Sequence, residues 1–167
     1  MDRFAEALLS RQANPALPAE DDWFAPLLGD WEFDYQDRGG RRLKGEWYFR
    51  RALDGMAIED LFICPSRDTR EENPQPDGEY GAAVRMYNPK RRCYDMTYIC
   101  SKGTTRLEAR KEGGRHRLYG AGGSFQPVAV CEGDRGHFPL AERDETGGGP
   151  PGELRGVRPA DTVTAAN

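Results

Sequence analysis

The sequence predicts a mainly β fold, an antiparallel meander of short strands that curls into a barrel, preceded by a short N-terminal helix. The clearest evidence is the segment Trp31–Gln36, where every second side chain is aromatic, so that Trp31, Phe33 and Tyr35 share one face of a strand. Similar short runs separated by tight turns continue to Gly120, as in antiparallel barrels and sandwiches. A chain of 167 residues is long enough for one domain with a core and too short for two.

The N-terminal region, residues 1–25, is predicted to form a helical cap. Residues 2–12 place four apolar side chains on one helical stripe, namely Phe4, Ala5, Leu8 and Leu9. A second helical turn over residues 20–27 carries Trp23 and Phe24, and these rings are expected to plug one end of the barrel.

Seven strands are expected in the barrel domain, residues 26–120. They cover residues 31–37, 43–52, 56–64, 80–87, 93–100, 104–111 and 115–120. The dipeptide Asp54-Gly55 between two apolar runs is a strong hairpin signal. The polar segment Ser66–Glu79 is long for a connection, and loops of that length are often lids or disordered.

The composition changes after Gly120. From Ala121 to Asn167 the chain contains no Trp, Tyr, Ile, Met or Lys, and the segment Gly147–Gly152 is too rich in glycine and proline for a central strand. Residues 121–167 are therefore predicted to be a low-complexity, disordered tail. A sharper hypothesis is that this tail is translated out of frame relative to an ancestral barrel, which the coding DNA around codons 120–150 would decide. Either way, the missing last strands predict an incompletely closed barrel with unpaired edges, which leaves homodimerisation by edge pairing open.

The charge is evenly mixed, with 24 basic and 28 acidic residues and a net charge of −4. This balance favours a soluble protein and argues against binding to nucleic acid or to a membrane surface. No apolar run approaches the roughly 18 residues that span a bilayer, and no signal peptide is evident, so cytoplasmic residence is expected. The cysteines lack metal-binding spacing and are predicted to be free, mostly buried thiols: Cys64, Cys93, Cys100 and Cys131.

Two basic clusters, Arg41–Lys44 and Lys90–Arg92, fall at or beside predicted turns. Charged turns are usually solvated, and this is the simpler interpretation of both clusters. The alternative is that one of them forms a phosphate site.

Several short motifs together resemble those of an uncharacterised bacterial lipocalin-like (calycin-type) β-barrel family over residues 26–120. They are Leu-Leu-Gly-Asp-Trp-Glu at 27–32, Gly-Glu-Trp at 45–47, Leu-Asp-Gly-Met-Ala-Ile-Glu-Asp at 53–60, Gly-Glu-Tyr-Gly at 78–81 and Tyr-Asn-Pro at 87–89. The resemblance implies a barrel with an apolar interior, and lipocalin-like barrels enclose small apolar ligands. It implies no particular activity. After Gly120 the family continues with aromatic strands that this chain lacks.

Alternation predicts which side chains face the barrel interior, where they either fill the core or line a cavity. The predicted inward set is Trp31, Phe33, Trp47, Phe49, Ile58, Phe62, Val84, Met86, Met96 and Tyr98. From this face and its surroundings we predict a ligand-binding set of Phe33, Tyr35, Trp47, Phe49, Asp60, Phe62, Met86, Met96 and Tyr98. Trp31 is expected to close the barrel floor.

Asp60 is the most informative polar residue on a predicted strand. It lies in register with Ile58 and Phe62, so it should face inward and should have a hydrogen-bonding or cationic partner, because a buried carboxylate without one is unfavourable. Arg85 alternates with Met86 and is expected to face the other way.

His116 is a candidate axial ligand for haem, since it lies on a late strand of a barrel. A lone histidine is more often a surface residue, and no spacing supports a zinc or iron enzyme. No catalytic motif is present, so we assign no catalytic residue.

The sequence therefore predicts binding of a small apolar or aromatic molecule in a β-barrel cavity. One alternative is a barrel-pocket enzyme of the isomerase, cyclase or decarboxylase type, in which Asp60 would pair with Tyr35, Tyr98 or Glu46. The other alternative is a vestigial protein with no ligand.

Overall fold

A computed structural model gives the fold of the chain. It describes residues 2–36, 40–72, 74–75, 78–112, 115–120, 125–128 and 153–159, with side chains for residues up to 112 and for 118–120. The elements in chain order are α1 (Arg3–Leu8), β1 (Leu9–Ser10), η1 (Ala19–Asp21), η2 (Ala25–Leu27), β2 (Gly29–Gln36), β3 (Arg42–Ala52), β4 (Ala57–Cys64), β5 (Glu79–Asn88), β6 (Cys93–Cys100), β7 (Gly103–Glu112), β8 (Arg115–Gly120), β9 (Phe125–Val128) and β10 (Glu153–Pro159). Here η denotes a 3-10 turn.

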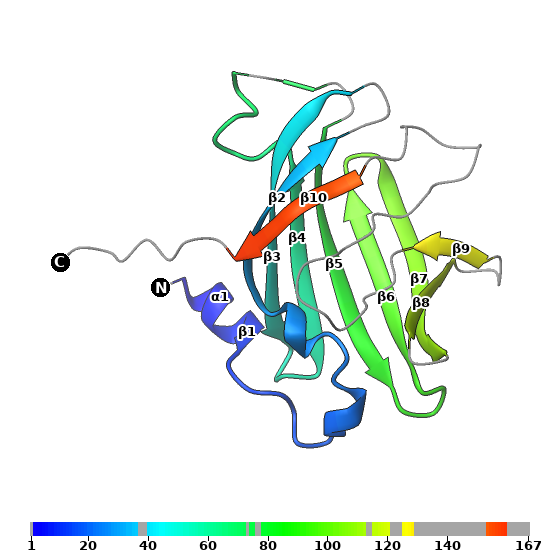
Figure 1. Ribbon diagram of the computed structural model, residues 1–167. Coiled ribbons are helices and arrows are strands. Elements are labelled where there is room, and N and C mark those ends of the chain that lie inside the picture. Colours follow the sequence, from blue (N-terminus) through cyan, green and yellow to red (C-terminus); the bar gives the residue numbers. More distant parts are fainter. Residues whose placement is uncertain are drawn as a thin grey trace.

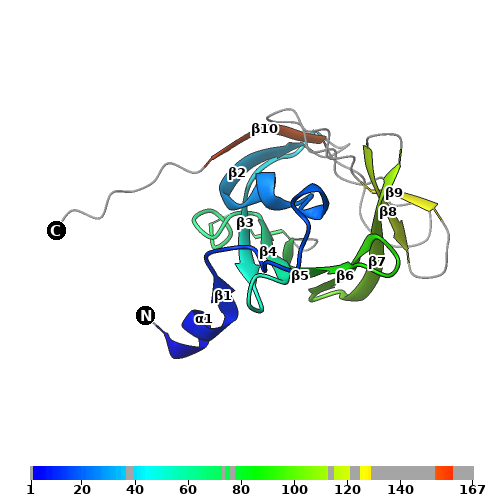
Figure 2. The same cartoon turned by 90° about the horizontal axis from the view of Figure 1, so that it is seen from below.

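The strands form one mainly antiparallel sheet that curls into a barrel-like shape (Figures 1 and 2). The sheet has ten strands in the order β10-β2-β3-β4-β5-β6-β7-β8-β9, with β1 added beside β3. Strands β2 to β8 form the meander predicted from the sequence. Among the described residues no pairing joins β9 to β10, so the barrel is not closed.

The N-terminal helix is shorter than predicted, because Leu9 and Ser10 leave it to pair with Ala52 and Arg51 of β3. Its predicted apolar stripe is only partly packed, since Phe4 is 70% exposed whereas Ala5 and Leu8 are half-buried. Among the described residues no helix is long and apolar enough to cross a bilayer.

The segment that contains η1 and η2 covers one end of the curled sheet (Figure 2). Trp23 and Phe24 are buried there, against Phe49, Tyr94 and other core side chains, as predicted for a plug. Trp31 packs against the same cluster, and its indole N–H donates to the carbonyl of Leu27 at 2.6 Å.

Two stretches of the region predicted as a tail lie in the sheet, β9 beside β8 and β10 beside β2. Both are edge strands, and each contains a proline, Pro127 or Pro159, which an edge strand tolerates because one side of it needs no ladder hydrogen bond. The pairing of β10 with β2 is interrupted between Arg155 and Arg158. Residues 121–124, 129–152 and 160–167 lie outside the described residues, and the frame hypothesis stays a prediction.

The facing of β5 differs from the prediction. The register pairs Asp60 with Ala83, Ile58 with Arg85, and Arg85 with Met96, so Arg85 faces inward together with them. Val84 and Met86 therefore lie on the outer face, and Met86 is 39% exposed. The prediction that these two side chains face inward was wrong, because the charged Arg85 lies on the buried side of this strand and its two neighbours lie on the other side.

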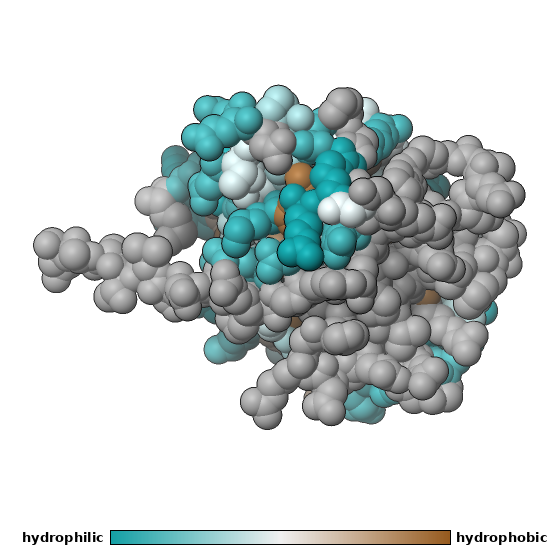
Figure 3. All heavy atoms as spheres, turned by 45° about the horizontal axis from the view of Figure 1, so that its top comes forward, coloured by the Kyte–Doolittle hydropathy of each residue, from teal (hydrophilic) through white to brown (hydrophobic). Residues whose placement is uncertain are grey.

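Of the four cysteines, Cys64, Cys93 and Cys100 are free thiols, and the first two are buried. Cys131 lies outside the described residues. The residues that Figure 3 colours by hydropathy are mainly hydrophilic on the face shown, in contrast to the aromatic interior.

Candidate functional site

A buried polar cluster lies on the inner face of the sheet, where β3, β4 and β5 run side by side. Asp60 is 3% exposed and Arg85 is 7% exposed. One Asp60 carboxylate oxygen accepts from the indole N–H of Trp47 at 2.7 Å, and the other accepts from Arg85 in an ion pair. The prediction that Asp60 faces inward and has a hydrogen-bonding or cationic partner is confirmed, since it has one of each kind.

Aromatic rings enclose this ion pair. The Arg85 guanidinium carbon lies 5.2 Å from the ring centroid of Phe24 and 5.4 Å from that of Phe49. Both distances fall within the roughly 6 Å range of cation–π attraction. The positive charge therefore has a carboxylate partner and two aromatic neighbours in a site removed from water.

The rings continue away from the ion pair along the inner face. Trp47 packs against Phe49 at 4.9 Å and against Phe62 at 5.4 Å, and Phe62 stacks on Phe33 at 5.1 Å, all between ring centroids. This row of rings offers an apolar lining next to one charged pair.

Two strand glycines admit rings into this face, a role that the sequence analysis did not assign to them. A Cβ atom at Gly45 would lie 2.1 Å from the Phe33 ring, and one at Gly81 would lie 2.1 Å from the Tyr98 hydroxyl oxygen. A glycine inside an aromatic strand often marks a close approach of this kind. The signal was present in the sequence.

The plugged end is fixed by polar contacts as well as by rings. The Tyr87 hydroxyl donates to the Asp21 carboxylate at 2.5 Å, and the Tyr94 hydroxyl donates to the Asp21 carbonyl at 2.6 Å. Arg51 forms an ion pair with Asp22. Burial, together with the nearby acidic groups, raises the pKa of both Tyr87 and Tyr94 above the ordinary range.

The structure brings most of the predicted ligand-binding set to one face, and it places the rest elsewhere. The residues on the inner face are Phe33, Tyr35, Trp47, Phe49, Asp60, Phe62, Met96 and Tyr98. Met86 lies on the outer face and does not belong to this site. The backbone of His116 pairs with Lys111 of β7, whereas its side chain lies outside the described residues, so the haem hypothesis stays a prediction.

Glu46 does not join Asp60, because it lies on the opposite face of β3. It accepts from the Arg67 side chain at 2.9 and 2.7 Å and from the Tyr48 hydroxyl. Burial alone would raise the pKa of Glu46, but the hydrogen bonds from Arg67 and Tyr48 lower it. Of the three partners that the enzyme alternative offers for Asp60, namely Tyr35, Tyr98 and Glu46, the last therefore lies on the wrong face of the sheet.

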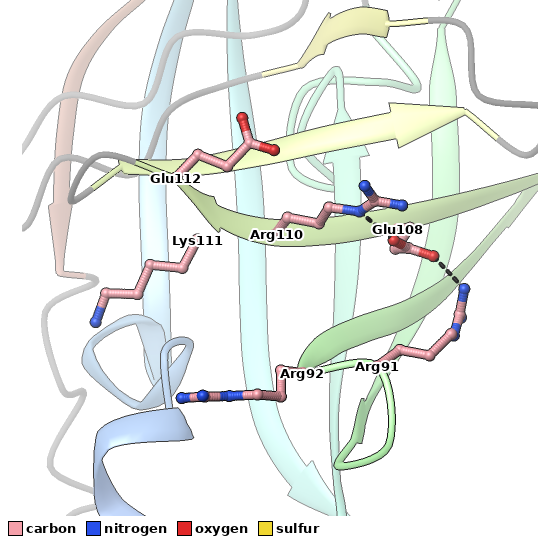
Figure 4. Close-up of a pocket in the computed structure, with 6 residues that line it drawn as sticks. All are labelled: Arg91, Arg92, Glu108, Arg110, Lys111 and Glu112. Atoms are coloured by element: carbon pink, nitrogen blue, oxygen red, sulfur yellow. Dashed lines mark hydrogen bonds and ion pairs between the residues drawn. The ribbon is translucent and has the colours of Figure 1, made fainter.

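A second cluster lies outside the barrel core, where the β5–β6 turn meets the end of β7. It surrounds a cavity of about 480 Å³ lined by Arg91, Arg92, Glu108, Arg110, Lys111 and Glu112 (Figure 4). None of the predicted ligand-binding residues lines this cavity. It arises because the register of β6 with β7 brings residues 108–112 beside the turn at 89–92.

Ligand atoms of Cys93, Asp95 and Glu108 lie within 4.8 Å of one another beside this cavity. Their carboxylates already accept from Arg91, from Arg110 and from the Asn88 amide. Burial raises the pKa of the Cys93 thiol, which keeps it protonated. The cluster is thus an arginine–carboxylate network.

Comparison with known proteins identifies no relative: no family model, no curated protein and no solved structure matches this chain.

Proposed function

We propose that this protein binds a small apolar or aromatic molecule, without covalent chemistry, on the inner face of its barrel-like sheet. The observation that carries the proposal is the Asp60–Arg85 ion pair, held among aromatic rings and capped by Trp47. A buried ion pair is weak evidence for stability, because desolvation offsets its attraction. We therefore infer that the pair orients the polar group of a ligand.

Apolar binding sites combine hydrophobic and aromatic walls with a few placed polar groups that orient the ligand. The row Phe33, Phe62, Trp47 and Phe49 supplies such a wall. Asp60 and Arg85 supply one acceptor and one donor group next to it. This combination supports a ligand with an aromatic or aliphatic body and a polar end.

The resemblance to lipocalin-like barrels supports the same proposal, since members of that class enclose small apolar ligands. We also propose cytoplasmic residence, supported by the free thiols of Cys64, Cys93 and Cys100, because a reducing compartment maintains free thiols.

A thermal-shift screen against fatty acids, flavonoids, polyketides and haemin tests the proposal. A ligand present at 100 times its Kd adds about 2.7 kcal/mol of stability. For a domain of this size, that corresponds to a rise in Tm of about 5–10 °C.

Two substitutions then show on which face of the sheet a ligand binds. Phe62→Leu, on the inner face, should weaken it, whereas Met86→Leu, on the outer face, should leave it unchanged. The proposal fails if no ligand class raises Tm, or if the two variants affect binding equally.

A further inference from the structure

The cavity at the β5–β6 turn has an unequal distribution of charge (Figure 4). Four of its six lining residues are cationic and two are carboxylates. Glu108 accepts ion pairs from both Arg91 and Arg110, and Arg91 also pairs with Asp95. These two arginines are therefore engaged with the acidic groups beside them.

The other two cations lie on a different side of the cavity. Figure 4 shows the side chains of Arg92 and Lys111 extending away from Glu108 toward the same side. Among the described residues neither forms an ion pair with a carboxylate. Arg92 instead hydrogen-bonds the Tyr87 hydroxyl, and this contact lowers the pKa of Tyr87 against the larger effect of burial. The cavity therefore offers two positive charges to a ligand.

The backbone at Arg92 is held in a left-handed conformation, with φ at 49°. Glycine adopts this conformation readily, whereas a side chain with a Cβ atom makes it less favourable. An arginine at such a turn position is unfavourable for the backbone, by about 1 kcal/mol or more. The turn alone therefore does not explain why an arginine stands at this position.

We propose that this cavity is an anion site that binds the phosphate group of a small phosphorylated molecule, with Arg92 and Lys111 as the binding cations. Arginine and lysine both bind phosphate, arginine through its planar fork and lysine as a point charge. A volume of about 480 Å³ exceeds the needs of one phosphate and falls in the range of small-molecule sites. The shared chemistry is a phosphate monoester or diphosphate, and none of the predicted ligand-binding residues of the inner face lines this site.

Isothermal titration of the full chain tests the proposal, with inorganic phosphate, pyrophosphate and AMP as the probes. All titrations are run at matched ionic strength with sulfate and chloride references and with EDTA present, because nonspecific attraction is screened by salt. Binding of pyrophosphate or AMP above the chloride reference is the expected result. AMP binding more tightly than phosphate would indicate an esterified ligand, and pyrophosphate alone would indicate a diphosphate.

Three variants distinguish a specific anion site from nonspecific attraction by the positive charge of this turn. Arg92→Gly and Lys111→Gln should each lower the affinity about 10-fold or more, the equivalent of one charged hydrogen bond. Lys90→Gln is the matched control, because it removes one charge from the same turn but does not line the cavity, and it should change affinity less than about 2-fold. Lys111→Gln should leave Tm unchanged, because Lys111 is exposed, and this shows that lost binding is not lost folding.

Three outcomes overturn the proposal. They are absence of binding above the chloride reference, an equal loss of affinity in Lys90→Gln and Arg92→Gly, and binding that appears only when EDTA is replaced by a divalent cation. The last would assign the anion to a metal held at Cys93, Asp95 and Glu108.

Discussion

The barrel interior and the outer cavity both contain arginine–carboxylate pairs, but they place them in opposite surroundings. Arg85 and Asp60 are almost completely buried among rings, whereas Arg91 and Asp95 are about half exposed. Burial removes water from a charge, which makes its partner indispensable, while an exposed pair exchanges one partner for water at little cost. The arginine–carboxylate pair in the barrel interior is therefore expected to affect folding and specificity. The pairs at the outer cavity are expected to affect only the local charge.

The sharpest way to break this comparison is to remove one partner of the buried pair. Arg85→Met leaves Asp60 buried without its cation and is expected to lower the free energy of unfolding by about 3–5 kcal/mol. Urea unfolding followed by tryptophan fluorescence measures this. The double variant Asp60→Asn with Arg85→Met removes the uncompensated charge and should recover part of the loss. Equal stability of the two variants would contradict this explanation.

Overpacking the interior tests the apolar half of the site. Gly45→Ala places a methyl group against the Phe33 ring and is expected to destabilise the fold by about 1–3 kcal/mol. Combining it with Phe33→Leu frees the space and should restore part of the stability, which urea unfolding of the four chains of this cycle reports. If the effects of the two substitutions on the free energy of unfolding are additive, the two residues are not in contact.

Alkaline pH should weaken the plug. The raised pKa values of Tyr87 and Tyr94 mean that the folded state favours the protonated phenols. Their contribution is fully present below the ordinary tyrosine pKa of 10.0, and it is lost as the pH rises from there toward the folded pKa. Tyr94→Phe is expected to lower stability by about 1 kcal/mol at pH 7, through loss of one hydrogen bond, and to flatten the decline above pH 10. Thermal unfolding between pH 8 and 11 measures both effects, and an unchanged slope would contradict the assignment to Tyr94.

The smallest effect is expected in the outer network. Arg110→Gln breaks the ion pair between the exposed Arg110 and the partly buried Glu108, and it should change the urea midpoint least of the substitutions named here, and less still in 0.5 M salt. Urea unfolding at two salt concentrations checks this. A loss comparable to that of Arg85→Met would erase the distinction between the two regions.

The meander and the inward position of Asp60 could be predicted because both follow from alternation between nearby residues. Arg85 could not be placed in the same way, since hydropathy assigns a charged residue to the outside and only the register with β4 brings it to Asp60. The outer cavity could not be predicted from the sequence for the same reason. Its Arg92 and Lys111 line one cavity only because β6 pairs with β7.

The pairing of β10 with β2 sets an order of events during synthesis. Strands β2 to β8 join neighbours along the chain and so form contacts of short range. The free edge of β2 instead pairs with residues 153–159, which lie more than a hundred positions later in the chain. A nascent chain on the ribosome therefore exposes that hydrogen-bonding edge for most of its translation, and the interval is when unwanted strand addition by other chains is most favoured.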